Sequence, residues 1–284
     1  MDSDVKGGIG LHARRVIAYI VLVFITIVCL FWFYVLFVNT SRTHGQIQMG
    51  FSIVPGTNLI KNWNNLMKSP QPVWSGLFNS VWVAGWTALF SVYFSTMTAY
   101  AIHVYRFKGR KLILTFILAV MMIPTQVTAL GFYRLMSDWN LLDSFIPLIV
   151  PGIAAPAVFF YMKQYMESAL PLEIIEASRI DGAGEFYTFN RMVTPIMKPA
   201  IAVQAIFSFV TSWNNYFLPA LLLTKANKKT LPILIAELRG ADFLKFDMGQ
   251  VYMMMTFAIL PVIVVYLVLS KHIVQGVALG SVKG

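Results

Sequence analysis

Long uncharged segments alternate with short charged segments along most of this 284-residue chain. A helix needs roughly 20 apolar residues to cross the hydrocarbon core of a bilayer. Six runs have about that length, and each predicts one membrane-crossing helix: Val16–Val38, Gly76–Ile102, Leu112–Gly131, Phe145–Met162, Ala200–Leu223 and Val251–Leu269. The pattern therefore predicts an all-α, polytopic membrane protein with six transmembrane helices.

The first run follows Arg14 and Arg15, as the hydrophobic part of a signal peptide does. It is longer than the roughly 7–15 apolar residues of such a region, and the residues 39–41 that follow it do not form a small-residue cleavage pattern. We therefore expect an uncleaved membrane anchor.

Composition agrees with a membrane protein and narrows the chemistry. Hydrophobic residues make up 58% of the chain and charged residues 12%, whereas soluble domains carry about 25% charged residues. The single cysteine, Cys29, excludes a disulfide framework within the chain, and the four histidines are too scattered in sequence to indicate a metal site. The net charge of +10 comes from basic residues in short loops rather than on one face, which disfavours nucleic acid as a partner.

Lysine and arginine predict the orientation, because cytoplasmic loops are enriched in both. With six spans both termini lie on one side, and that side carries thirteen of the 22 basic residues. Four of them cluster in one very short loop, at Arg106, Lys108, Arg110 and Lys111. We therefore expect both termini to be cytoplasmic.

Acidic side chains fall in the predicted loops or at the edges of spans. Ion-coupled carriers usually place a titratable group near the membrane midplane, so a carrier of that class is disfavoured. The chain also has no GxxxxGK[ST] phosphate loop, and the glycine-rich end at 276–284 resembles one only superficially because its lysine is misplaced. Energy for any transport is therefore expected from a separate ATPase, and no cofactor is expected in this chain.

The longest patterned hydrophilic stretch, residues 163–198, joins the fourth and fifth predicted spans. Its first half predicts a short helix that Pro171 opens, since proline is tolerated in a first turn, and that Gly182 ends in the left-handed conformation. A second short helix is expected from about 183 to 193, ended by Pro195. Its apolar face, at i, i+3, i+7 spacing, consists of Phe186, Phe189 and Val193.

Two short helices hinged at a glycine form a compact knob that suits the groove of a partner, with Glu176 as a charged anchor. The run from Glu176 to Ala183, followed by prolines, resembles the EAA loop of inner-membrane permeases in binding-protein-dependent ABC importers, with Ser178 in place of the usual second alanine. An ordinary interfacial loop lying on lipid headgroups is the alternative. The residues that the resemblance assigns to ATPase coupling are Glu176, Ala177, Ser178, Asp181, Gly182 and Ala183.

This resemblance extends roughly over residues 74–284 and implies a type I ABC importer permease that works by alternating access. Such a subunit is not itself an enzyme: it forms half of a translocation pathway in the inner or plasma membrane. The implied partners are a second homologous permease, an ATPase dimer that binds ATP and Mg, and an extracytoplasmic substrate-binding protein. The expected division is a cytoplasmic N-terminus (1–15), a first anchor (16–38), an extracytoplasmic loop (39–75), a permease core (76–270) and a cytoplasmic tail (271–284).

The C-terminal residues narrow the resemblance to carbohydrate importers. They look like the basic, glycine-punctuated tail that closes the smaller permease of maltose-type importers. By that resemblance the tail reaches the ATPase dimer, whereas a solvated, disordered end is the alternative. The tail residues concerned are Gln275, Gly276, Gly280 and Lys283.

Residues 213–216 resemble the Trp-Asn-acid-aromatic signature of sugar permeases, although Asn215 departs from the acidic residue often found there. Sugars present apolar ring faces edged by hydroxyl groups, so an aromatic side chain beside amides suits a sugar pathway. The alternative is that the amides bind neighbouring helices and the aromatic residues mark the membrane interface. The candidate pathway residues are Asn79, Gln126, Gln204, Trp213, Asn214, Asn215 and Tyr216.

Two outer loops are candidates for docking the substrate-binding protein. Residues 231–250 combine aromatic and charged side chains, as a wet, specific contact surface does, and a plain connector is an equal alternative. The other loop, 45–74, is expected to be irregular because it contains three prolines. The docking residues expected in the first loop are Gly240, Asp242, Phe243, Phe246 and Asp247.

Other functions stay open alongside a sugar permease. They are a permease for another solute of the same superfamily, an ion-coupled secondary carrier, and a membrane-embedded lipid–sugar transferase. Asp138 and Asp143 are a thin candidate for the acidic site that such a transferase needs. The identity of the saccharide is not fixed, and Lys225, Lys228 and Lys229 leave an anionic one open.

Overall fold

The computed structural model describes the backbone of residues 5–240 and 246–280 and the side chains of residues 10, 12–240 and 246–271. Within these ranges all regular structure is helical, which confirms the all-α prediction. The chain divides into two compact units. One comprises residues 1–70 and 237–257, and the other comprises residues 71–236 and 258–284.

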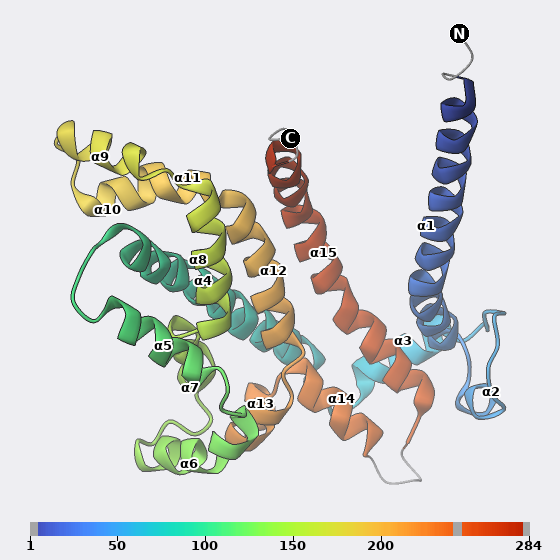
Figure 1. Cartoon of the computed structure of the whole chain (residues 1–284). Coiled ribbons are helices and arrows are strands. Elements are labelled where there is room, and N and C mark those ends of the chain that lie inside the picture. Colours follow the sequence, from blue (N-terminus) through green and yellow to red (C-terminus); the bar gives the residue numbers. More distant parts are fainter. Residues whose placement is uncertain (1–4, 241–245, 281–284) are drawn as a thin grey trace. The chain divides into compact units, whose positions relative to one another are not determined.

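The larger unit is built around α4 (Val73–Val104), which packs against α8 (Pro156–Ala169) and α12 (Lys198–Trp213) (Figure 1). Small side chains on α4 are buried in these contacts. Small residues let helices approach closely in a membrane, where there is little hydrophobic drive for helices to associate. The residues concerned are Ala84, Ala88, Ser91, Ser95 and Ala99.

The predicted span 112–131 is broken rather than continuous. It consists of α5 (Arg110–Val120) and α6 (Thr125–Asp138), whose axes differ by 95°. Pro124 precedes α6, and a proline disfavours helical geometry in the residue before it. The described residues contain four helices long and apolar enough to cross a membrane, and up to six spans if each bent pair counts as one.

The fourth and fifth predicted spans are also segmented. The fourth begins with α7 (Ile146–Ile149) and the 3-10 turn η1 (Val150–Ile153), and continues as α8. Prolines stand at the start of each of these pieces, where their missing N–H costs little. In the fifth, α12 ends at Trp213, and α13 (Phe217–Leu222) follows after three residues.

Helix α14 (Leu231–Arg239) occupies the beginning of the segment that was expected to be an outer loop. A Cβ placed on Gly76 would lie 2.5 Å from Leu234 Cδ1, so the start of α4 and α14 approach closely. The Leu231 amide also donates to Ser80 Oγ at 2.8 Å. The turn η3 (Ala226–Lys228) precedes α14.

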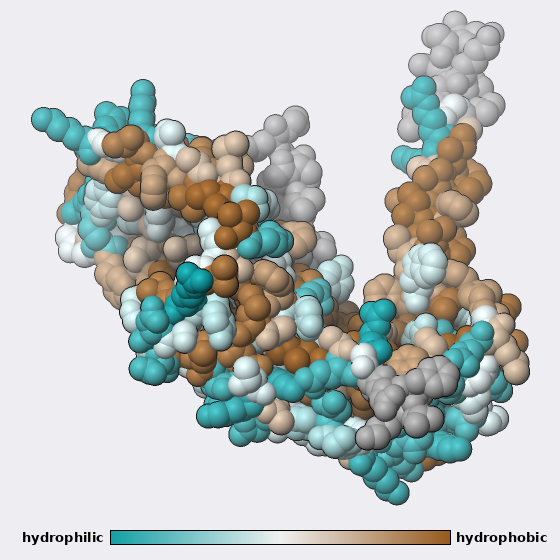
Figure 2. Space-filling model, turned by 90° about the horizontal axis from the view of Figure 1, so that it is seen from below, coloured by the Kyte–Doolittle hydropathy of each residue, from teal (hydrophilic) through white to brown (hydrophobic). Residues whose placement is uncertain are grey.

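The smaller unit contains α1 (Val5–Thr40), α2 (His44–Gln48), α3 (Leu59–Lys68) and the part of α15 (Met248–Gly280) up to Phe257. Figure 2 shows α1 as a rod covered by hydrophobic side chains, with hydrophilic ones near its N-terminal end. The expectation of an irregular loop at 45–74 is only partly correct: the stretches that contain its prolines, 49–58 and 69–72, are irregular, but α2 overlaps its start and α3 lies within it. The buried Asn62 of α3 donates to the Thr40 carbonyl at 2.8 Å and to the Arg42 carbonyl at 2.9 Å.

Candidate functional site: coupling segment and polar cavity

Helix α9 (Leu172–Ile180) begins directly after Pro171 and ends as the sequence predicts. Gly182 has φ 77°, which lies in the left-handed region. The Gly182 amide donates to the Arg179 carbonyl at 3.1 Å, and the Ala183 amide donates to the Ser178 carbonyl at 3.0 Å. These bonds form a Schellman motif, which satisfies the last carbonyls of the helix and requires a residue that tolerates positive φ.

The second short helix differs from the prediction. It consists of α10 (Glu185–Thr188), a π-helical turn η2 (Phe189–Val193) and α11 (Thr194–Ile196). Pro195 does not stop it, because proline lies in the first turn of α11, where its N–H is not needed. The chain bends by 82° before α12. We call residues 171–197 the coupling segment.

The predicted apolar face of this helix is only partly buried. Phe189 and Val193 are buried, but Phe186 is 68% exposed. The wider π turn changes the angular spacing of side chains, so a pattern based on 3.6 residues per turn does not hold across it. Sequence reasoning also missed Ile180 and Tyr187, which are exposed at 87% and 60%. We call Ile180, Phe186 and Tyr187 the apolar tip.

The six residues expected to contact the ATPase do not share one surface. Glu176, Ala177, Asp181 and Gly182 are exposed, and Ala183 is partly buried. Ser178 is buried instead, and its hydroxyl lies 2.6 Å from that of Thr188 on α10. Ser178 therefore joins α9 to α10, and the surface open to a partner consists of the exposed residues of α9 together with the apolar tip.

A polar cluster ties the coupling segment to the end of α4. Glu185 accepts hydrogen bonds from Arg179 Nε and from the Tyr100 hydroxyl, both at 2.8 Å. The Arg179 guanidinium also lies 5.5 Å from the centre of the Tyr105 ring. The sequence gives no local signal for this cluster, since Tyr100 and Glu185 are 85 residues apart.

A hydrophobic core lies beneath the coupling segment. Ile175, Phe189 and Val193 are buried in the same cluster as Tyr100 of α4 and Met162 of α8. Close-packed interiors transmit displacement rather than absorb it. The coupling segment therefore shares one close-packed core with α4 and α8.

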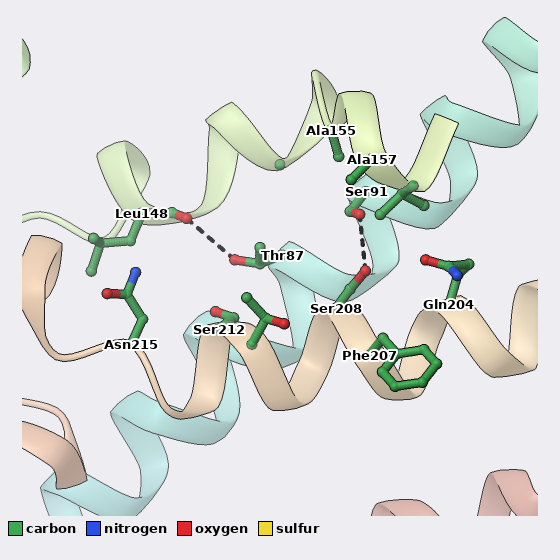
Figure 3. A pocket seen from close by; sticks show the side chains of 13 residues that line it. Thr87, Ser91, Leu148, Ala155, Ala157, Gln204, Phe207, Ser208, Ser212 and Asn215 are labelled. Carbon is green, nitrogen blue, oxygen red and sulfur yellow. Dashed lines mark hydrogen bonds between the residues drawn. The ribbon is translucent and has the colours of Figure 1, made fainter. Parts of the chain in front are cut away.

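A cavity of about 360 Å³, whose lining is mostly apolar but includes a set of polar side chains, lies between α4, the α7–α8 region and α12 (Figure 3). At this cavity the backbones of η1 and α4 approach closely, because a Cβ on Gly152 would lie 3.1 Å from the Thr87 carbonyl oxygen. The polar side chains in its lining are hydroxyls and amides, supplied by Thr87, Ser91, Gln204, Ser208, Thr211, Ser212 and Asn215. Every one of these residues is uncharged.

Three of the cavity hydroxyls are occupied by bonds between helices. The Ser91 and Ser208 hydroxyls lie 3.1 Å apart, and the Thr87 hydroxyl donates to the Leu148 carbonyl at 3.3 Å. A second cavity, of about 420 Å³, lies between α6, α7 and α13 and shares Leu148 and Asn215 with the first. Asn215 thus stands where the two cavities meet.

The structure separates the seven predicted pathway residues. Gln204 and Asn215 line the cavity, but the other five do not. Asn79 donates to the Asn227 and Lys229 carbonyls, both at 2.9 Å, so it holds the turn before α14. Trp213 is buried and stacks on Phe209 at 5.5 Å. The remaining three, Gln126, Asn214 and Tyr216, are exposed outside the cavity lining.

The hydroxyl residues of the cavity were missed because a serine or threonine in an apolar run usually bonds its own helix backbone. Their spacing offers a signal that could have found them. Ser208 and Ser212 of α12 are four residues apart, as are Thr87 and Ser91 of α4, so each pair lies on one helix face. Two such polar faces in apolar helices indicate a shared polar interior.

Two of the predicted docking residues, Phe246 and Asp247, have local structural roles. Phe246 contacts the His44 ring at 5.6 Å, and Asp247 Oδ1 accepts from the Gly249 amide at 2.8 Å, at the start of α15. Gly240 is exposed after α14. Asp242 and Phe243 lie outside the described residues.

The predicted tail is helical as far as it is described, because α15 continues to Gly280. Helix α15 therefore includes the backbone of Gln275, Gly276 and Gly280. The side chains of these residues lie outside the described part of the chain. Lys283 lies outside it entirely.

Asp143, a candidate acid for a transferase, is used structurally. Its carboxylate accepts from the Thr224 amide at 2.6 Å, the Lys225 amide at 2.8 Å and the Thr224 hydroxyl at 2.9 Å. The backbone N–H of Lys225, followed by the Thr224 donors, holds the pKa of this carboxyl below its ordinary value. Within the described part of the chain, no group of three or more His, Cys, Asp or Glu side chains is placed to hold a metal.

Comparison with known proteins places this arrangement in a family. Residues 91–279 match the family described as "Binding-protein-dependent transport system inner membrane component". The chain belongs to this family. It is therefore a permease subunit of an ABC importer and a multi-pass membrane protein, and its relatives are transport permeases rather than enzymes.

Named relatives are similar over most of the permease chain. The arabinooligosaccharides transport system permease protein AraQ of Bacillus subtilis is 33% identical over 242 residues, covering 84% of each chain. The lactose transport system permease protein LacG of Rhizobium radiobacter is 28% identical, covering 94% of this chain and 96% of LacG. The sn-glycerol-3-phosphate permease protein UgpE of Yersinia pestis is 29% identical, covering 92% and 95%.

A solved structure confirms the permease fold. A chain from a bacterial ABC transporter involved in the import of the acidic polysaccharide alginate superposes with a TM-score of 0.77 at 21% identity. The match covers 92% of this permease and 96% of that chain.

Proposed function

We propose that this permease subunit imports a saccharide and forms half of the translocation pathway beside a second, homologous permease. A separate ATPase pair, which binds ATP and Mg, drives it through the coupling segment, and an extracytoplasmic binding protein delivers the substrate. Two named relatives, for arabinooligosaccharides and lactose, support the substrate class. The C-terminal part of α15 is proposed to contact the ATPase pair.

The proposed mechanism is supported mainly by the two different surfaces of the coupling segment. Its outer surface offers Glu176 and the apolar tip, which suits a groove with apolar walls and a basic or polar partner for the carboxylate. Its inner surface belongs to the core shared with α4 and α8. A partner that moves the tip therefore moves the membrane helices with it.

Both termini are proposed to be cytoplasmic. The coupling segment lies at the opposite end of the larger unit from α6 and α13 (Figure 1). Arg179 contacts Tyr105, so the basic loop at 106–111 lies at the same end as the coupling segment. Basic loops concentrate on the cytoplasmic side, which gives this end that orientation.

The test is uptake by the assembled importer in vesicles loaded with ATP. Glu176→Lys is expected to leave membrane insertion intact while lowering both uptake and substrate-stimulated ATP hydrolysis at least tenfold. Asp138→Lys, which makes the same charge reversal at the C-terminal end of α6, serves as the matched control and should retain both activities. Substrate-stimulated ATP hydrolysis at the normal rate in Glu176→Lys would refute the proposed coupling role.

A further inference from the structure

The cavity between α4, α8 and α12 has unused hydrogen-bonding capacity. Gln204 is 9% exposed and lines the cavity (Figure 3). Within the described part of the chain, the side chains of Gln204, Ser212 and Asn215 line the cavity without a hydrogen bond to another protein group, and the Thr211 side chain beside them is exposed. Polar groups that line a cavity without a protein partner are free to bond a polar occupant or water.

The types of group in the lining indicate the chemistry of the occupant. The two amides each offer both donors and an acceptor, and the hydroxyls of Thr211 and Ser212 act either way. A sugar ring presents hydroxyl groups with the same double capacity around its edge. Phe207, which is largely exposed at the cavity rim, supplies an apolar surface for the face of such a ring.

The absence of charge in the lining further restricts the class of saccharide that the cavity would bind. No Asp, Glu, Lys, Arg or His occurs among the described residues that line either cavity. The lysines that left an anionic saccharide open lie elsewhere, since Lys225 is exposed on the turn before α14 and Lys228 lies 4.8 Å from the Phe145 ring centre. An ionised sugar acid or phosphate in this cavity would lack a counter-charge, which is costly away from water.

We propose that this cavity is a subsite for one uncharged, polyhydroxylated ring, which passes between α4, α8 and α12 during import. The inference rests on the proposed function, because it identifies where and in what form the saccharide meets this subunit. A volume of about 360 Å³ is near the lower end of the roughly 300–1,000 Å³ typical of ligand pockets.

The test uses cysteine protection in the complete importer, with both permeases, the ATPase and the binding protein in proteoliposomes. Cys29→Ser removes the single native cysteine. Ser212→Cys then places a thiol in the cavity, and Ser75→Cys places one on an exposed site of α4 outside it. The probes are arabinotriose and lactose, which are neutral, and glycerol 3-phosphate and an alginate trisaccharide, which are anionic.

During ATP-driven import of a neutral probe, labelling of Ser212→Cys by N-ethylmaleimide is expected to slow at least threefold, while that of Ser75→Cys stays unchanged. Import of a neutral probe without this protection would overturn the subsite, because the hydroxyls would then serve only helix packing. Import of the anionic probes alone would overturn the assignment of charge. An assembled complex that imports none of the four would overturn the proposed function as well.

A second variant keeps the test valid if Ser212→Cys does not assemble. Gln204→Leu removes the amide at similar volume and is expected to lower neutral-saccharide import at least tenfold. Gln164→Leu, on the exposed face of α8, is the matched control and should import at the normal rate. Equal import by both variants would overturn the role of Gln204 in the subsite.

Discussion

The hydroxyl oxygens of Ser178 and Thr188 lie 2.6 Å apart and join the two short helices of the coupling segment. Thr188 also donates to the Gly184 carbonyl at 3.2 Å, so its hydroxyl links both helices and the turn between them. This buried contact between small side chains, together with the exposed Arg179–Glu185 ion pair, holds α9 beside α10.

Substitution of Ser178 is expected to depend on size more than on polarity. Ser178→Ala loses one hydrogen bond, worth about 1 kcal/mol, and keeps the helices together. Ser178→Leu overpacks a buried site and should cost about 1–3 kcal/mol, forcing α9 away from α10. We expect near-normal uptake for the alanine variant and at least a tenfold loss for leucine, measured with the assembled importer. Equal losses would show that the spacing of the helices is not what matters.

Gly182 is expected to be required for its conformation alone. A Cβ at this position would meet nothing within 4 Å, but φ is 77°. Gly182→Ala should therefore cost about 1–2 kcal/mol and increase proteolysis of the coupling segment. Gly184→Ala is the matched control, since a Cβ there also meets nothing and φ is −69°. Identical protection of the two variants from protease would contradict this explanation.

The two bonds to Glu185 are expected to differ in strength. Arg179 and Glu185 are 41% and 45% exposed, so solvent screens their ion pair, which is worth about 0.2–1 kcal/mol. The Tyr100 hydroxyl is buried and donates to a charged acceptor, a bond worth about 1.5–3 kcal/mol. Double-mutant cycles with Glu185→Ala, Arg179→Ala and Tyr100→Phe, measured by unfolding in mixed micelles, should give this order.

Tyr93→Phe is a suitable control for that cycle. The Tyr93 hydroxyl donates to Asn190 Oδ1, a neutral acceptor, at 3.3 Å. Its coupling energy with Asn190→Ala should be about 0.5–1.5 kcal/mol. A stronger coupling here than between Tyr100 and Glu185 would show that the charge on Glu185 does not strengthen its bond.

The turn at Thr224 and Lys225 is expected to loosen in acid. Hydrogen bonding, first from the Lys225 amide, lowers the pKa of Asp143 in the folded protein. A depressed carboxyl pKa stabilises the fold above the unfolded value of about 3.9, and this contribution is lost as the pH falls through the folded pKa. Hydrogen exchange at the two amides should therefore accelerate as the pH falls below about 4, after correction for intrinsic exchange rates.

Asp143→Asn should show fast exchange at these amides already at neutral pH, with little further dependence on acid. Asp138→Asn makes the same substitution at the end of α6 and should behave as the unmodified protein does. Unchanged protection in Asp143→Asn would show that the backbone, rather than the carboxylate, holds the turn.

The sequence predicted those features that depend on local chemistry. The hinge at Gly182 follows from glycine's tolerance of positive φ, and its Schellman motif forms within a few residues. The apolar runs likewise predicted helices, because the length of an uncharged run is a local property of the sequence. The bend of 95° before Thr125 was not predicted, because a proline in an apolar run also fits a continuous, packed helix.

Features that depend on distant contacts could not be predicted. Asn79 was assigned to the pathway by residue type and Trp213 by its resemblance to a sugar-permease signature, but in the structure Asn79 holds the turn before α14 and Trp213 packs on Phe209. Conversely, Ser91 and Ser208 face each other only because α4 and α12 pack side by side. A single residue type fits both a helix contact and a ligand site, and only packing distinguishes the two.

The apolar tip lies largely outside the core beneath it, since Ile180, Phe186 and Tyr187 are all more than half exposed. Under the proposed function, the residues that select the ATPase are therefore separate from those that pack the membrane helices. Exchanging these three side chains for those of another importer should redirect the permease to a foreign ATPase without redesigning the membrane helices. A substitution in the ATPase groove can likewise be compensated in the permease by substitutions at a few surface positions.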